Sequence, residues 1–181
     1  MKLRKLLDFD AHFSTRLRVA ENPGVLRTIA MFFAHSGDSW FCILGLSLIW
    51  FWANSDWKYR ALIMGASIVI TAILVLMLKF TIKRRRPEGD WGEIYRSTDP
   101  HSFPSGHATR AFMLALMAIY LGPTWFGLVL AVWAPLVALA RVAMGVHYLS
   151  DVVVGALLGI LMGWINFHIL PELFGTLASF F

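Results

Sequence analysis

Three short stretches of the sequence contain side chains that can act on a phosphate group, at residues 79–87, 103–107 and 141–151. The third stretch holds His147 and Asp151, which are four residues apart. On a helix this spacing places both side chains on one face, where the carboxylate can accept a proton from one imidazole nitrogen. The other nitrogen is then unprotonated and able to attack phosphorus. The spacing predicts an activated histidine nucleophile, with a plain ion pair between Arg141 and Asp151 as the alternative.

The second stretch, Phe-Pro-Ser-Gly-His at residues 103–107, has the composition of a helix start that binds an anion. Ser105 suits the N-cap position, and Gly106 lets a ligand approach the backbone closely. Free N–H groups at a helix start, with the helix dipole behind them, favour a bound anion. His107 in the first turn would face that anion and could pass a proton to a leaving oxygen. The alternative is a capped helix start with an interfacial histidine.

The first stretch carries five Lys and Arg residues within positions 79–86, more than a simple membrane anchor needs. Arginine offers a planar fork of donors and lysine a compact charge, so together they can hold and neutralise the oxygens of a phosphate. The alternative is the positive-inside rule, which places Lys and Arg at cytoplasmic helix ends without any catalytic role.

The elements that must position these stretches are membrane-spanning helices. Of the 181 residues, 58% are hydrophobic and 15% are charged, which is too apolar for a soluble domain of this size. A bilayer-spanning helix needs roughly 20 mostly apolar residues, and Gly122-Pro123 divides the longest charge-free run into two helices. The sequence therefore predicts an all-α membrane helical bundle with about five spans, at residues 38–54, 60–80, 105–121, 124–143 and 149–169.

The amino-terminal residues 1–36 alternate apolar and charged side chains, which predicts a helical segment lying in the membrane interface. With a transmembrane core at 37–170, they form a single membrane-embedded domain over residues 1–181. Five spans place the end of the second span, the start of the third and the connection between the fourth and fifth on one side of the membrane. All three stretches can therefore meet at one pocket.

In order and spacing, the three stretches resemble the motifs of the type 2 phosphatidic acid phosphatase family, the membrane lipid phosphate phosphatases. The matching residues are Lys79 with six residues to Arg86-Pro87, then Pro104-Ser105-Gly106-His107, then Arg141 with five residues to His147 and three more to Asp151. Bacterial acid phosphatases and vanadium haloperoxidases share this pocket.

The resemblance implies a role for each matching residue. His147 attacks phosphorus to form a phosphohistidine, Asp151 orients His147, and His107 protonates the departing lipid oxygen. The phosphate is bound by Lys79, Arg86, Ser105, Gly106 and Arg141. The chain departs from the family pattern at Ala140, where serine is usual, and in lacking the amino-terminal span that many members have.

The activity predicted is removal of a terminal phosphate from a membrane lipid such as phosphatidic acid, phosphatidylglycerol phosphate or undecaprenyl diphosphate. No cofactor and no metal are expected, because the pocket offers cations and helix N–H groups rather than a cluster of carboxylate or thiolate ligands. A vanadium haloperoxidase-like enzyme and a non-catalytic membrane scaffold are the alternatives. Membrane lipids rather than nucleic acid are the expected partners, because most of the cations behind the net charge of +5 lie beside membrane segments.

Three further features carry expectations of their own. Asp38 is predicted to cap the first span with its side chain. The polar loop at 88–102 has two open interpretations: it selects the lipid headgroup, or it is a solvated connector. Only Lys58 and Arg60, of the 16 Lys and Arg residues, lie on the side opposite the pocket. The positive-inside rule therefore predicts that the pocket and the amino terminus face the cytoplasm.

Overall fold

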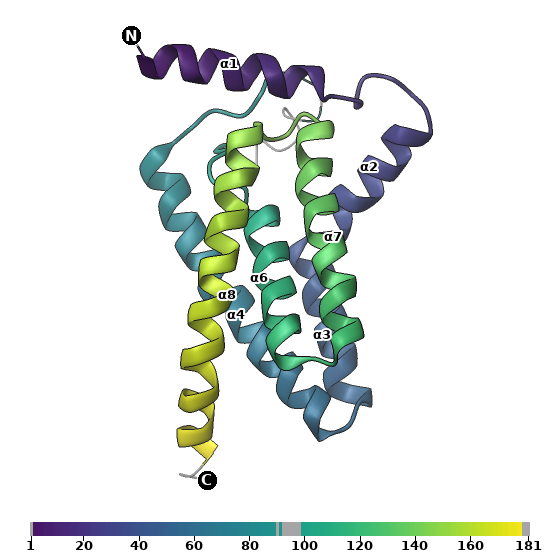
Figure 1. Ribbon diagram of the computed structural model, residues 1–181, viewed down its shortest axis with the longest axis vertical. Coiled ribbons are helices and arrows are strands. Elements are labelled where there is room, and N and C mark those ends of the chain that lie inside the picture. The colour runs from purple at the N-terminus through teal and green to yellow at the C-terminus, as the bar shows by residue number, and fades with distance from the viewer. Residues whose placement is uncertain (1, 90, 92–98, 179–181) are drawn as a thin grey trace.

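The structure is a computed structural model that describes residues 2–89, 91 and 99–178, and these residues are almost entirely helical (Figure 1). An isolated β-bridge between Arg85 and His101 is the one extended pairing among them. In chain order the helices are α1 (Lys2–Arg16), α2 (Val25–Ser36), α3 (Ser39–Trp52), α4 (Ser55–Ile82), α6 (Gly106–Leu121), α7 (Thr124–Ala143) and α8 (Leu149–Ala178). The predicted all-α fold class is confirmed.

Helix α6 lies at the centre of the bundle, packed against α8, α7 and α4. Three glycines of α8 meet it, and a Cβ added to any of them would come within 3.0 Å of a backbone carbonyl oxygen of residues 105–113; they are Gly155, Gly159 and Gly163. Small residues at every fourth position let membrane helices approach closely. This contact holds the start of α6 beside the start of α8, where two of the predicted motifs lie.

Three of the described helices, α4, α7 and α8, are long and apolar enough to cross a membrane. Helices α2 and α3 pass the same test together, as a pair bent by 62°, and α6 is a shorter apolar helix. The predicted spans correspond in order to α3, α4, α6, α7 and α8, but α2 leads directly into the first of them. Residues 25–36 were expected in the interface; instead Ala30 and Ala34 are buried in a cluster with Ala140 of α7, because this segment has an apolar face of its own.

The outer faces of these helices expose many large apolar side chains. Examples from three helices are Trp52 at 78%, Leu128 at 61% and Leu157 at 63% exposure. A soluble protein rarely leaves so much apolar surface in contact with water. The exposed surface is therefore a lipid-facing one, as expected of a multi-pass membrane protein.

Helix α1 lies across the end of the bundle at which α4 ends and α8 begins (Figure 1). Phe9 and Phe13 are exposed on a flank of this helix. On its inner side, Asp10 and Ser14 accept hydrogen bonds from the backbone N–H groups of Ser150 and Leu149, at 3.1 and 2.8 Å. This two-sided pattern suits a helix lying along a membrane surface.

Candidate active site

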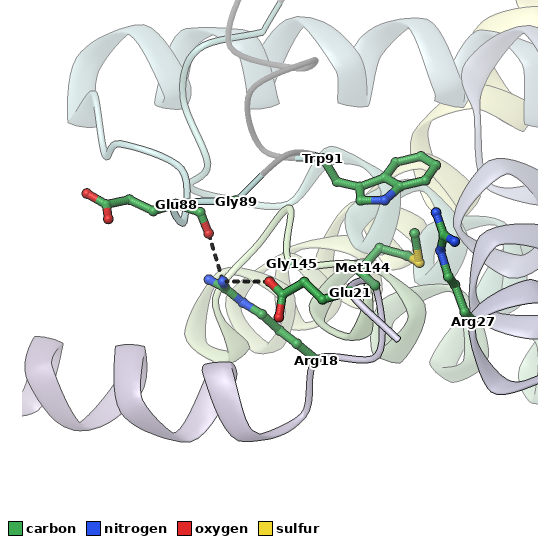
Figure 2. A pocket seen from close by; sticks show the side chains of 9 residues that line it. Arg18, Glu21, Arg27, Glu88, Gly89, Trp91, Met144 and Gly145 are labelled. Carbon is green, nitrogen blue, oxygen red and sulfur yellow. Dashed lines mark hydrogen bonds and ion pairs between the residues drawn. The ribbon is translucent and has the colours of Figure 1, made fainter. Parts of the chain in front are cut away.

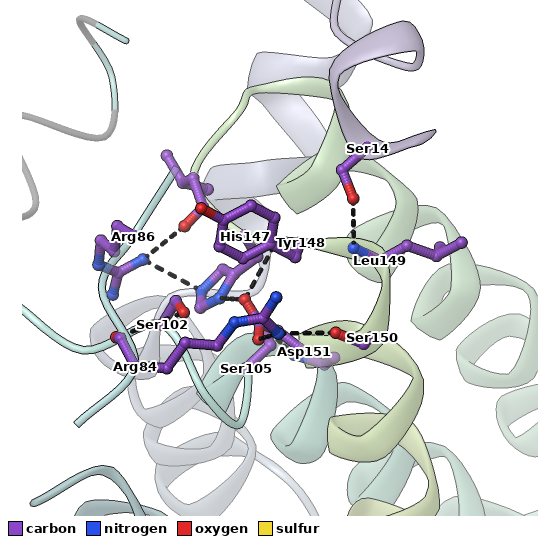
Figure 3. A network of polar contacts seen from close by, with 12 residues as sticks. Ser14, Arg84, Arg86, Ser102, Ser105, His147, Tyr148, Leu149, Ser150 and Asp151 are labelled. Atoms are coloured by element: carbon purple, nitrogen blue, oxygen red, sulfur yellow. Dashed lines mark hydrogen bonds and ion pairs between the residues drawn. The ribbon is translucent and has the colours of Figure 1, made fainter. Parts of the chain in front are cut away.

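The predicted site residues lie at helix ends and connections on the side of the bundle that α1 covers (Figure 1), and Figure 3 shows Arg86, Ser105, His147 and Asp151 there. Lys79 is in the last turn of α4, Ser105 is the N-cap of α6, Arg141 is in the last turn of α7 and Asp151 is in the first turn of α8. Each sits at a helix end because the apolar run that forms the helix stops there. The ends of four helices thus bring together motifs that are far apart in the sequence.

Two cations of the first motif are buried around a carboxylate that sequence reasoning missed, that of Asp99. The Arg86 guanidinium is 3% exposed and donates from Nη2 to Asp99 Oδ2 at 2.7 Å and from Nε to the Asp99 carbonyl at 2.6 Å. The Lys79 ammonium pairs with the same carboxylate oxygen. Burial raises the pKa of Asp99, but Lys79 and Arg86 outweigh it and hold the pKa of that carboxyl below its usual value. These two cations therefore hold an anion already.

His147 lies in the connection between α7 and α8, 1% exposed, with its two ring nitrogens in different surroundings (Figure 3). Nε2 is 3.3 Å from Arg86 Nη1, within the cation cluster. Nδ1 faces Asp151 Oδ2 at 3.6 Å, slightly beyond hydrogen-bonding distance. Burial and the positive charges of Arg86 and Arg141 lower the pKa of His147 well below its ordinary value of 6.5. The imidazole is therefore neutral at physiological pH, as a nucleophile must be.

Asp151 is fully buried, and its carboxylate pairs with a residue that the sequence did not single out, Arg84. Arg84 Nη1 donates to Asp151 Oδ1 at 2.7 Å, and the backbone N–H of Tyr148 donates to Oδ2 at 2.9 Å. The alternative ion pair between Asp151 and Arg141 is not formed among the described residues. Arg84 Nη2 also donates to Asp10 at 2.7 Å, so it links the α8 carboxylate to helix α1.

The second motif forms the start of α6, where Ser105 caps the helix. Its Oγ accepts from the Ala108 N–H at a long 3.5 Å, and its own N–H donates to the Asp151 carbonyl at 3.0 Å. His107, in the first turn, contacts Asp38 through Nε2, 2.6 Å from Oδ1. Arg141 is 1% exposed and reaches the Ala34 carbonyl at 3.4 Å. His107 is therefore paired with Asp38, whereas the carboxylate that faces His147 is that of Asp151.

Asp38 corrects one prediction. It occupies the N-cap position of α3, but its side chain makes no capping hydrogen bond to that helix. The carboxylate turns instead to His107 and His35, because two imidazoles lie within reach and an ionised carboxylate bonds strongly to such donors.

A polar cavity of about 160 Å³ lies on the same end of the molecule, beside the connection that carries His147 (Figure 2). Arg18, Arg27, Trp91 and Gly145 are among the residues that line it. Arg18 donates to the Glu88 carbonyl at 2.7 Å, which ties the α1–α2 segment to the start of the polar loop. The expectation for that loop falls largely on residues 90 and 92–98, which lie outside the described residues.

Residues 60–174 of the chain match the PAP2 superfamily. The chain belongs to the PAP2 superfamily. The resemblance inferred from the three motifs is thereby confirmed.

Relatives of this PAP2 protein include enzymes named for phosphate removal from lipids. The decaprenylphosphoryl-5-phosphoribose phosphatase of Mycobacterium tuberculosis is 34% identical over 147 residues, which are 80% of each chain. The undecaprenyl-diphosphatase of Sulfolobus acidocaldarius is 32% identical over 111 residues, which are 57% of this chain and 52% of the relative.

Two solved structures share the fold. The transmembrane PAP2-type phosphatidylglycerolphosphate phosphatase of Bacillus subtilis matches with a TM-score of 0.74 at 24% identity, covering 93% of this chain and 87% of its own. LpxE of Aquifex aeolicus matches with a TM-score of 0.68 at 26% identity, covering 86% and 92%. The architecture of the bundle is therefore that of membrane PAP2 proteins.

Proposed function

We propose that this PAP2 protein is a membrane lipid phosphatase that removes a terminal phosphate through a phosphohistidine intermediate. The observation that carries the proposal is the buried His147, whose Nε2 lies 3.3 Å from a guanidinium of the cation cluster. A neutral imidazole beside fixed positive charge can attack a phosphate held by those charges. The two relatives described above, a decaprenylphosphoryl-5-phosphoribose phosphatase and an undecaprenyl-diphosphatase, carry names that support the same reaction.

In the proposed reaction the substrate phosphate replaces the Asp99 carboxylate as the anion held by Lys79 and Arg86. Arg141 and the N–H groups at the start of α6, around Ser105 and Gly106, complete its binding. The His147 Nε2 lone pair forms a bond to phosphorus while the P–O bond to the lipid breaks. His107 gives a proton to the departing oxygen, and Asp151 stabilises the positive charge that develops on His147.

Water completes the cycle. Neutral His107 takes a proton from a water molecule whose oxygen attacks phosphorus, and the P–N bond electrons return to His147. Inorganic phosphate is released and both histidines regain their starting states. Every proton in this sequence is handled by residues of the chain.

The substrate class is a lipid with a terminal phosphate at the membrane surface, because the His147 cluster lies at the end of the bundle beneath α1 while apolar helices continue into the membrane. Phosphatidic acid, phosphatidylglycerol phosphate and a polyprenyl diphosphate all meet this description. The cytoplasmic face is proposed as the side on which the pocket lies, from the distribution of Lys and Arg.

The test is phosphate release by the purified protein in detergent, measured side by side on these three lipids, with and without chelator and vanadate. We expect turnover of at least one lipid. This activity should persist in EDTA and should be inhibited by vanadate, which mimics the trigonal-bipyramidal phosphorus. Among the described residues, no three His, Cys, Asp or Glu side chains are grouped to hold a metal ion. Strict dependence on added Mg²⁺, or no release from any of the lipids, would contradict the proposal.

A further inference from the structure

We propose that Asp38 is a positioning residue for His107, fixing its tautomer and stabilising its protonated form for the transfer of a proton to the leaving oxygen. The proposal rests on the proposed function and deepens it. An ionised carboxylate can only accept hydrogen bonds, so the 2.6 Å contact between Asp38 Oδ1 and His107 Nε2 requires a proton on Nε2. Nδ1 is then the nitrogen left to exchange a proton with substrate and water.

The position of Asp38 is set by the break between α2 and α3, which is fastened to the bundle core. Arg110, one turn after His107 on α6, donates to the Gly37 carbonyl from both Nε (3.1 Å) and Nη2 (2.6 Å). Trp133 of α7 donates to Ser36 Oγ at 2.9 Å. The break is therefore held against α6, which carries His107, and against α7.

Gly37 makes the close approach possible. A Cβ at this position would lie 2.6 Å from a methyl carbon of Val137 and 3.4 Å from the His107 ring. Any larger residue would push the break away from α6 and α7, and Asp38 with it. Capping of α3 alone would not require this close packing of Gly37 against Val137 and His107.

The arrangement gives Asp38 the same work in both halves of the reaction. During P–O cleavage the imidazolium loses its Nδ1 proton to the lipid oxygen, while Asp38 keeps the Nε2 proton in place. During hydrolysis the neutral ring presents its Nδ1 lone pair to water, because the Nε2 proton is still held. The carboxylate itself stays ionised throughout, so no proton is gained or lost by Asp38.

The experiment compares Asp38→Asn with the wild type on two substrates in detergent micelles. Phosphatidic acid has an alkoxide leaving group that needs a proton, whereas p-nitrophenyl phosphate releases a stable phenolate. General acid catalysis contributes typically about 10²–10⁴-fold. We expect kcat/KM to fall about 100-fold or more on phosphatidic acid but less than about tenfold on the aryl phosphate. In a His107→Gln background, Asp38→Asn should cause no further loss on phosphatidic acid, because Asp38 acts through His107.

Asp56→Asn, at an exposed carboxylate in the first turn of α4, is the matched control and should leave both rates near those of the wild type. Equal losses on the two substrates, no loss on phosphatidic acid, or a further loss in the His107→Gln background would overturn the assignment. If Asp38→Asn does not fold, as judged by its melting temperature in detergent, Asp38→Glu carries the same comparison. Unfolding of both variants would mean a structural ion pair. A wild type that releases phosphate from neither substrate would contradict the proposed function instead.

Discussion

The imidazole of His147 is the group on which the proposed chemistry depends most, since it is 1% exposed and lies within the cation cluster. His147→Ala should lower phosphate release by at least about 10³-fold, because removal of a nucleophile removes the reaction path itself. The measurement is inorganic phosphate from purified protein, with the melting temperature in detergent as a check on folding. His168→Ala, at an exposed histidine whose ring meets Trp164 of α8 edge to face, is the control. A His147→Ala protein that kept more than about a hundredth of wild-type turnover would show that another group attacks phosphorus.

The acid limb of the pH profile provides a second prediction for His147. Burial and the neighbouring guanidinium groups lower the pKa of His147, so the protonated form appears only well below the ordinary value of 6.5. Acidification to pH 6.5 should therefore leave the nucleophile neutral and active. We expect kcat/KM, once the ionisation of the substrate phosphate is divided out, to stay level from neutral pH down past pH 6.5. A midpoint of inactivation at or above 6.5 would show that His147 titrates as an ordinary exposed histidine.

Sequence spacing identified the motif residues but not their partners, and the reason is geometric. His147 and Asp151 are neighbours within one short segment, so their spacing carries information about their distance. Asp38 meets His107 across 69 positions, and Arg84 meets Asp151 across 67. Nothing in a single sequence reports such contacts, because they depend on how α3, α6 and α8 pack. Asp38 therefore looked like a cap, Asp99 was not singled out, and Arg84 was one of the five cations of the first stretch without a predicted partner.

At the scale of elements, the glycines of α8 determine how closely α8 and α6 approach each other. A Cβ at Gly159 would lie 2.3 Å from the Thr109 carbonyl oxygen, whereas a Cβ at Gly65 of α4 would meet nothing within 4 Å. Overpacking typically costs about 1–3 kcal/mol, so Gly159→Ala should lower the melting temperature in detergent by several degrees and reduce activity. Gly65→Ala, the matched control, should be neutral or slightly stabilising. Equal melting temperatures for the two variants would mean that α6 and α8 are not held this closely.

The helices themselves were largely predictable, because long charge-free runs and the turn at Gly122-Pro123 determine where they begin and end. The predicted segment 124–143 coincides with α7, and 105–121 differs from α6 by one residue. The sequence did not predict that α2 and α3 together form one bent apolar segment. Polar residues at Ser36 and Asp38 interrupt the apolar run there, and a sequence window cannot tell a bend fastened by Arg110 from a true end.

At the scale of the whole molecule, α1 covers the end of the bundle that holds the active site. Asp10 of α1 receives a hydrogen bond from Arg84, which also pairs with Asp151. Phe9 and Phe13, each one position before a residue that faces the bundle, are exposed on a flank of the helix. Contact of these phenylalanines with a lipid surface would place the proposed site, with Asp151, near the headgroups, where a lipid phosphate lies.

Because the proposed site lies at one end of the bundle, the distribution of Lys and Arg residues predicts which side of the membrane that end faces. Lys58 and Arg60, at the start of α4, lie at the opposite end from the pocket, and Arg60 donates to the Leu121 carbonyl there at 2.6 Å. In the sequence the other Lys and Arg residues fall on the pocket side, and Lys79, Arg86 and Arg141 account for only three of them as phosphate ligands. The remaining excess is the asymmetry that orients membrane proteins with their positive side toward the cytoplasm.

We therefore predict that the amino terminus and the pocket face the cytoplasm and that the carboxy terminus, at the far end of α8, faces outward. Reporter fusions in a bacterial host measure this directly, because green fluorescent protein fluoresces only in the cytoplasm and alkaline phosphatase is active only outside it. Green fluorescent protein should be bright at the amino terminus and dark at the carboxy terminus, where alkaline phosphatase should be active. The reverse pattern would place the pocket outside and show that the cations serve phosphate binding rather than orientation. A cytoplasmic pocket would restrict the enzyme to lipid phosphates of the inner leaflet, because a charged headgroup does not cross the apolar core of a bilayer unaided.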